Sequence, residues 1–265
     1  MAKTSENNEK PLPLFKRWKL QIGSHQLDAD HTAVIVPIVS DKQLEPRLFA
    51  ASVRFADLVE IRADLVWPSN EEAGIAEQMG HLRSLTSLPL IFTFRSKEEG
   101  GQWTARLSDR LREWDYLVQN KLCDAVDIEF SEYLAQPAAY SNLLELCSVS
   151  GVKTIFSHHN YDRSYTAAEV RDILTDMKRA ECDLPKLACI ADDQEAALEI
   201  VRGGYSAALQ LRQCVIAIAM GRYGRITRLA GHDYGQAATF ASGLPDSSSA
   251  PGQLPADSLK NFLGD

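Results

Sequence analysis

The sequence predicts an α/β protein whose parallel strands close into a (β/α)8 TIM barrel. Short apolar runs rich in β-branched residues recur along the chain, and segments with helical spacing separate them. The runs are nearly continuous rather than alternating, as expected of strands covered on both faces. Eight such units in roughly 230 residues favour a closed barrel over a doubly wound sheet, and no GxGxxG follows the first strand.

The expected elements alternate through most of the chain. The apolar runs place strands at 33–39, 57–61, 88–94, 125–130, 152–156, 186–191, 214–220 and 237–241. Helical spacing is found at 74–85, 109–122, 138–151, 167–181, 192–211 and 226–235. The stretch from 242 to 255 is rich in Gly, Ser and Pro, which is typical of a mobile loop after the eighth strand.

The first 30 residues precede this pattern. Within them, WKLQIG and SHQL are expected to form a short hairpin that closes the N-terminal end of the barrel, and the rest of the extension is expected to be partly flexible. We therefore expect an N-terminal extension at 1–30 and one barrel domain at 31–265, a length that a single barrel commonly occupies.

Composition excludes several classes of protein. Lys plus Arg is 28 and Asp plus Glu is 36, a net charge of −8, which argues against nucleic acid or an anionic membrane as the main partner. No apolar run approaches the roughly 18 residues of a membrane span, and the N-terminus lacks the apolar core of a secretory signal. We expect a cytoplasmic protein. Its five cysteines are well separated, without a CxxC pair, which indicates reduced thiols rather than a disulfide framework or a metal site.

Polar side chains gather where the expected strands end, which is where barrels of this kind carry their chemistry. Glu60 and Arg62 end the second strand and share one face because they are two residues apart. Each residue alone has an ordinary structural explanation, such as a surface ion pair. Their coincidence on one rim is what favours a site. The other members are Arg95 and Glu99, Asp127 and Glu129, Ser157 to Asn160, and Arg222, Arg225 and Arg228.

Lys186 stands at the head of the apolar sixth strand, where a buried ammonium is costly unless it is paired. One explanation is a lysine that precedes the strand and reaches water. The other is an amine that attacks a carbonyl to form an imine, assisted by a proton-transfer group such as a histidine on the neighbouring fifth strand. The arginines fit carboxylate or phosphate groups, so the predicted substrate is a small anionic carbonyl compound.

Six motifs in this order resemble type I 3-dehydroquinate dehydratase, the Schiff-base dehydratase of the shikimate pathway of aromatic amino acid biosynthesis. They are EIRAD (60–64), FTFRSKEEGG (92–101), SHHN (157–160), KLA (186–188), MGRYGRITR (220–228) and SSAPGQ (248–253). The resemblance spans residues 33–255 and includes the interval of 27 residues from His159 to Lys186. It implies a barrel, commonly a homodimer, that converts 3-dehydroquinate to 3-dehydroshikimate and water without a metal or organic cofactor.

The resemblance also implies roles for single residues. Lys186 would form the imine with the substrate ketone, His159 would remove the proton from carbon 2 and protonate the leaving hydroxyl, and Glu99 would orient the histidine. Arg228 would bind the substrate carboxylate. The other implied substrate contacts are Glu60, Arg62, Arg95, Ser249, Gln253, Met220 and Phe240.

The chain departs from the family pattern at a few positions. His158 stands where Tyr or Asn usually precedes the catalytic histidine, and Thr227, Gln236 and Ile218 replace residues that are commonly Ser, Ser and Met. Alternation along the strand puts His159 on the same face as Ser157 and puts His158 on the other. This pattern favours His159 as the base and leaves His158 as a neighbour that hydrogen-bonds beside the site, unless a bulge reverses the faces.

Two alternatives remain open from the sequence. One is another Schiff-base barrel, such as a class I aldolase or transaldolase, although those usually carry a phosphate-binding backbone after strands seven and eight. The other is a non-catalytic barrel that binds a small carboxylate.

Overall fold

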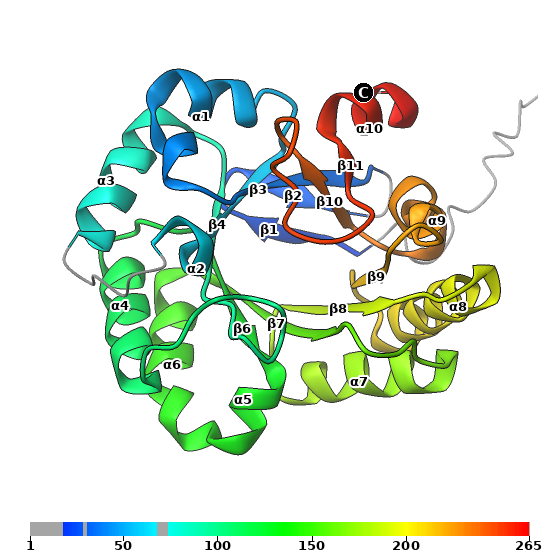
Figure 1. Cartoon of the computed structure of the whole chain (residues 1–265). Helices are drawn as coiled ribbons and strands as arrows, with labels where there is room; N and C mark the ends of the chain where they lie inside the picture. Colours follow the sequence, from blue (N-terminus) through cyan, green and yellow to red (C-terminus); the bar gives the residue numbers. More distant parts are fainter. Residues whose placement is uncertain (1–17, 29–30, 68–73, 265) are drawn as a thin grey trace, which may run out of the picture.

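Eight parallel strands follow one another in sequence order around a curled sheet, as Figure 1 shows. The computed structural model describes residues 18–28, 31–67 and 74–264. The eight strands are β3 (Ala33–Ile38), β4 (Leu58–Arg62), β5 (Leu90–Thr93), β6 (Ala125–Glu129), β7 (Lys153–Asn160), β8 (Leu184–Ile190), β9 (Ile216–Met220) and β10 (Ala238–Ser242). All eight expected strands are present, and the predicted fold class is confirmed.

The sheet closes at two junctions of different character. β10 pairs with β3 in parallel, with Ala238 opposite Ala33 and Phe240 opposite Ile35. Between β9 and β10 there is one parallel bridge, from Val215 to Gln236. A short strand, β11 (Leu254–Pro255), adds to β10 after the loop that follows it.

Helices surround the sheet (Figure 1). Five of the six expected helical segments form α3 (Ile75–Leu85), α4 (Leu107–Gln119), α6 (Ser141–Ser150), α7 (Ala167–Arg179) and α8 (Gln194–Leu211). The sixth divides into α9 (Arg225–Leu229) and a 3-10 turn at Gly231–Tyr234. Further helices are α1 (Pro46–Ser52), α2 (Ala63–Val66), α5 (Phe130–Ala135) and α10 (Ala256–Leu263).

The contact between α7 and α8 shows how sequence sets the packing. Thr166 and Glu169 form a capping box that starts α7, since each side chain bonds the other's backbone N–H. Val170 on the buried face of α7 then meets Gly203 of α8. A Cβ on Gly203 would lie 2.5 Å from the Cβ of Val170, so only glycine lets the helices approach this closely.

The barrel interior is filled from its N-terminal end. The hairpin of β1 (Leu20–Ile22) and β2 (His25–Leu27) inserts Ile22 and Leu27 among interior residues such as Ile35 and Ile155. The expected N-terminal hairpin is therefore confirmed. Residues 1–17 and 29–30, where the expected flexible part and the domain boundary fall, lie outside the described residues, so the division at residue 30 stays a prediction.

Several strand boundaries differ from those expected, and two of these differences matter for the site. β7 continues to Asn160 because its pairing with β8 extends to Asn160 opposite Cys189, so both histidines belong to the strand. β8 begins at Leu184, which puts Lys186 inside the strand, where it is 4% exposed. The explanation of a lysine that precedes the strand and reaches water is therefore wrong.

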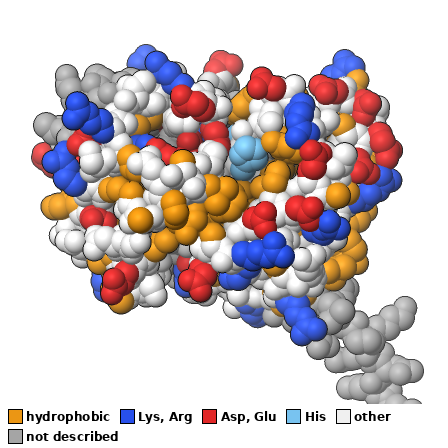
Figure 2. All heavy atoms as spheres, turned by 90° about the horizontal axis from the view of Figure 1, so that it is seen from below, with side chains coloured by type: hydrophobic (Ala, Val, Ile, Leu, Met, Phe, Trp, Pro, Cys, Tyr) orange, Lys and Arg blue, Asp and Glu red, His pale blue; other side chains and the backbone are white. Residues whose placement is uncertain are grey.

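Acidic and basic side chains are interspersed over the face seen in Figure 2, and an apolar stretch crosses its middle. Among the described residues, the most exposed large apolar side chains are Val149 on α6 at 76%, Phe262 on α10 at 63% and Leu134 on α5 at 60%. Within the described ranges, no helix has both the length and the apolar character needed to cross a bilayer.

Candidate functional site

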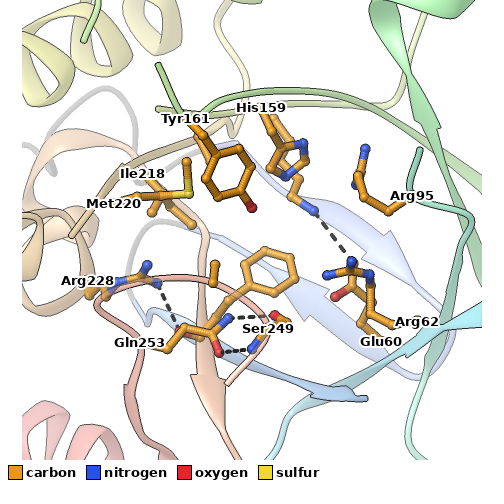
Figure 3. Close-up of a pocket in the computed structure, with 14 residues that line it drawn as sticks. Glu60, Arg62, Arg95, His159, Tyr161, Ile218, Met220, Arg228, Ser249 and Gln253 are labelled. Carbon is orange, nitrogen blue, oxygen red and sulfur yellow. Dashed lines mark hydrogen bonds and ion pairs between the residues drawn. The ribbon is translucent and has the colours of Figure 1, made fainter. Parts of the chain in front are cut away.

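A pocket opens at the C-terminal ends of the barrel strands (Figure 3). The empty space within it is about 450 Å³, including solvent-filled space at its mouth. Ten of the eleven residues predicted from the sequence line it, and the eleventh, Glu99, lies behind His159. The other lining residues, which sequence reasoning had not placed in the site, are Tyr161, Ala188, Ile218 and Ala250.

Lys186 is held by charge and by an aromatic ring. Its Nζ donates a hydrogen bond to Asp127 Oδ2 at 2.9 Å and lies 3.7 Å from Glu60 Oε1. The same nitrogen lies 4.3 Å from the ring centroid of Phe240, within the range of a cation–π contact. Asp127 was noted as a strand-end residue but was not among the predicted site residues. It could have been predicted from its position two residues before Glu129, because residues two apart on a strand lie on the same face.

Arg95 is the centre of a buried network of carboxylates. It donates to Asp127 Oδ1 at 2.7 Å, to Ser157 Oγ at 3.0 Å, and to Glu99 and Glu129 at 3.3 Å each. Burial lowers the pKa of the Arg95 guanidinium, but the carboxylates outweigh burial and raise it. Burial likewise raises the pKa of Asp127, whereas Arg95 and Lys186 hold that pKa well below its ordinary value. Asp127 is therefore a permanent anion beneath Lys186.

His159 is oriented by Glu99. Its Nδ1 lies 3.0 Å from Glu99 Oε2, and its backbone N–H donates to the same oxygen at 3.1 Å. Burial and the cations Arg95 and Lys186 lower the pKa of His159 to about 3, so the imidazole is neutral at pH 7. With Nδ1 carrying the proton toward the carboxylate, Nε2 has a free lone pair at the pocket. This is the arrangement of a general base.

Glu99 contacts both histidines. Its Oε1 lies 3.4 Å from His158 Nδ1 and accepts a hydrogen bond from Ser131 Oγ at 3.0 Å. Burial raises the pKa of Glu99, but the two imidazoles and Arg95 hold it well below its ordinary value. His158 does not line the pocket, which agrees with the predicted alternation of faces along β7.

Arg228, on α9, faces the pocket from the side opposite Arg62 and Glu60 in Figure 3. It is buried and donates to the carbonyl oxygens of Phe240 at 3.1 Å and Pro251 at 3.5 Å, while its Nε has no partner. Among the residues that the structure describes, no carboxylate forms an ion pair with it. Burial lowers the pKa of Arg228 to about 10, so the group stays cationic at pH 7. A buried cation without a counter-charge is an anion-binding group.

The remaining predicted residues frame the pocket. Ser249 and Gln253, in the loop between β10 and β11, bond each other twice at 2.9 Å. Arg62 makes two bonds of 2.9 Å to Asp64, and Glu60 accepts from Thr93 Oγ1 at 2.9 Å. Met220 and Phe240 supply apolar surface. The lining residue Tyr161 directly follows the SHHN motif, and that position was the signal that could have identified it.

Other reactive groups lie away from the pocket. The five cysteines are buried and free, and burial raises the pKa of each thiol. They are Cys123, Cys147, Cys182, Cys189 and Cys214. In the described part of the chain, no group of three or more His, Cys, Asp or Glu side chains is arranged to hold a metal ion.

A parallel (β/α)8 barrel with a buried lysine, a carboxylate-held histidine and an unpaired arginine around one pocket defines a barrel enzyme for a small anionic molecule. The comparisons with known proteins specify which one. The family model described as type I 3-dehydroquinase matches residues 32–264, and the chain belongs to that family.

Relatives and solved structures agree with this assignment. The chain is 35% identical over 239 residues to the 3-dehydroquinate dehydratase of Methanosarcina barkeri. This match covers 90% of this chain and 96% of that protein. It is 28% identical to the Bacillus subtilis enzyme of the same name, over 87% of this chain and 90% of that one. The crystal structure of 3-dehydroquinate dehydratase from Geobacillus kaustophilus superimposes with a TM-score of 0.85 at 26% identity, covering 94% and 96% of the two chains.

Proposed function

We propose that this enzyme dehydrates 3-dehydroquinate to 3-dehydroshikimate through an imine on Lys186. The observation that carries the proposal is the buried Lys186 amine, with neutral His159 on one side of the pocket and the unpaired Arg228 on the other. The names of its relatives supply the substrate. This assignment takes the place of the aldolase and carboxylate-binding alternatives.

Binding begins with the substrate carboxylate. Arg228 pairs with it, since the guanidinium is the buried cation without a counter-charge. The ring hydroxyls then meet Glu60, Arg62, Arg95, Ser249 and Gln253, while Met220 and Phe240 cover the apolar ring edge. This pose brings the ketone to Lys186.

The chemistry follows from the charges around Lys186. The Lys186 ammonium gives one proton to the neutral Nε2 of His159, and the amine adds to the ketone. His159 then returns that proton to the carbinolamine oxygen, which leaves as water, and the nitrogen becomes an iminium that withdraws electrons from the neighbouring C–H bond. Asp127 stabilises this cation as it stabilises the ammonium, since it lies 2.9 Å from Nζ. The Nε2 atom of His159 takes the carbon 2 proton and returns a proton to the leaving hydroxyl, which departs as water. Hydrolysis of the imine then releases the product and the amine.

Borohydride trapping tests the proposal. Incubation with 3-dehydroquinate and sodium borohydride is expected to fix one reduced adduct on Lys186, located by peptide mass, while enone absorbance reports turnover. The Lys186→Met variant is the matched control and should show neither signal with its fold intact. Turnover by wild-type protein without a trapped adduct would refute the imine.

Assembly as a homodimer and a cytoplasmic location remain predictions. Light scattering of the purified protein measures the mass of the assembly, for which a dimer of 29.4 kDa chains is expected.

A further inference from the structure

His158 is the second imidazole of the SHHN motif, and it occupies a position that the proposed mechanism does not use. Its side chain is 24% exposed and lies outside the pocket, against Glu99 on one side and Tyr165 on the other. Two adjacent histidines, His158 and His159, therefore contact the one carboxylate of Glu99, and this arrangement needs a physical explanation.

The tautomer of His158 is set by a series of hydrogen bonds that begins at the main chain. Asn160 Oδ1 accepts the backbone N–H groups of Asp162 at 2.9 Å and Arg163 at 3.1 Å. These bonds fix the amide so that its Nδ2 donates to the Tyr165 hydroxyl oxygen at 2.8 Å. The acceptor side of Tyr165 is thereby engaged, and its O–H proton is free to be donated elsewhere.

The next contact uses that proton. Tyr165 OH lies 2.8 Å from His158 Nε2, and we assign the hydroxyl as donor and Nε2 as acceptor because Asn160 already donates to the hydroxyl oxygen. A neutral imidazole that accepts at Nε2 carries its proton on Nδ1. That nitrogen lies 3.4 Å from Glu99 Oε1, which is an ion-pair contact with the carboxylate. On the other side of the carboxylate, Glu99 Oε2 accepts a hydrogen bond from His159 Nδ1 at 3.0 Å.

We propose that His158 is a positioning residue for the catalytic base, held by Asn160 and Tyr165 so that it fixes the Glu99 carboxylate and thereby the orientation of His159. The inference rests on the proposed function, because it assigns His158 a part in the same reaction. His158 does not touch the substrate; it acts through Glu99. His159 Nδ1 at Oε2 and His158 Nδ1 near Oε1 together restrict the rotation of the carboxylate, so Nε2 of His159 stays aimed at the pocket.

The charges around the two imidazoles determine what removing His158 does. The charged and titratable groups that face them are Glu99 and Arg95 after β5, Asp127 on β6, Lys186 on β8 and Tyr165 after β7. Without the His158 donor, the Glu99 charge is shared with one imidazole fewer and stabilises the His159 cation more strongly. His159 would then protonate at higher pH, and Glu99 Oε1 would keep Ser131 as its partner but lose the contact that restricts it on the side of His158.

The test compares three variants of the active enzyme. His158→Leu removes the donor, and we expect kcat to fall about tenfold with KM within about twofold of wild type, because misorientation of a base affects the chemical step. The acidic limb of kcat/KM should move to higher pH. His158→Asn keeps an N–H donor near the Nδ1 position and should restore both values. Tyr165→Phe removes the bond that sets the tautomer and should give an intermediate loss.

His81→Leu is the matched control, since His81 is an exposed histidine on α3, away from the pocket, and its loss should change none of these values. A merely structural His158 would lower Tm in the leucine variant without moving the acidic limb or being rescued by asparagine, and that result would overturn the proposal.

A second measurement does not depend on the folding of any variant. Long-range proton–nitrogen NMR spectra of wild-type protein at neutral pH should show His158 with its proton on Nδ1. A proton on Nε2 would contradict the proposal directly. Wild-type protein that fails to dehydrate 3-dehydroquinate would instead refute the proposed function, so the two failures are distinguishable.

Discussion

At the scale of single residues, the site is a set of charges that is incomplete at one point. Arg95 forms ion pairs with Asp127 and Glu99, and Lys186 forms an ion pair with Asp127. In the described part of the chain, no carboxylate pairs with Arg228 at the pocket, and this is why we propose that it binds the substrate carboxylate. The sequence predicted these residue types because each follows or ends an apolar run.

The sequence could not predict the Lys186–Asp127 contact. These residues are 59 positions apart, and their approach depends on the register of three neighbouring strands. The role of Tyr161 was missed for the same reason: its chain position suggested the rim, but only the path of β7 into the next loop turns its ring toward the pocket.

The neutral His159 predicts a stability that falls in acid. Burial lowers its folded-state pKa to about 3 from an ordinary value near 6.5. Between these values the unfolded chain binds a proton that the folded chain does not, so stability is greatest above pH 6.5 and declines as the pH falls. The contribution is up to about 1.4 kcal/mol per pH unit in this window.

Urea unfolding at pH 7.0 and pH 5.5 measures this effect, and that range avoids most carboxylate titration. His159→Asn should lose less stability than wild type between the two values. Equal losses in both proteins would show that another group is responsible.

At the scale of elements, long periodic segments were predicted well and short ones were not. α7 and α8 have enough turns to show a repeating apolar face, whereas α2 and α5 are four and six residues long. Helices this short are set by tertiary packing rather than by their own pattern. β7 was expected to stop at 156 because polar residues follow, yet its backbone continues to pair with β8 while His159 turns inward.

The close contact between α7 and α8 predicts opposite effects of one substitution at two glycines. Gly203→Ala places a methyl group 2.5 Å from Val170 Cβ and 2.7 Å from the carbonyl oxygen of Ala167, and should destabilise the protein by about 1–3 kcal/mol. Gly80→Ala, in α3, has no atom within 4 Å and should stabilise it by up to about 1 kcal/mol. Chemical denaturation of both variants measures the two values, and a neutral Gly203→Ala would mean that the helices can separate at no cost.

At the scale of the whole molecule, the junction between β9 and β10, called the seam below, has one main-chain bridge, and side chains before β10 and on α9 accept N–H groups of β9 beside it. Ala217 N–H donates to Gln236 Oε1 at 3.3 Å, and Ala219 N–H donates to Thr227 Oγ1 at 3.1 Å. Both acceptors are buried. Gln236 and Thr227 are two of the positions where this chain departs from the family pattern, and the seam gives them a structural role that the sequence did not reveal.

Gln236→Leu should therefore loosen the seam. The substitution leaves the Ala217 N–H buried without its Gln236 acceptor, which should lower the free energy of unfolding by about 1–3 kcal/mol. Hydrogen exchange of the Ala217 amide should accelerate, while that of Leu187 between β7 and β8 should change only with global stability. Gln210→Leu, at an exposed glutamine on α8, is the control. An unchanged Ala217 exchange rate would show that β10 itself protects the strand.

The two junctions of the barrel also differ in how far along the chain they reach. β10 and β3 join segments about two hundred residues apart through a main-chain ladder, whereas the seam joins neighbours in sequence. Opening the seam would turn the cylinder into a curled sheet without losing any long-range pairing. A circular permutant with new ends between β9 and β10 would keep the pairing of β10 with β3 inside one continuous sheet. Its folding would show whether the barrel needs the seam between β9 and β10 in order to fold.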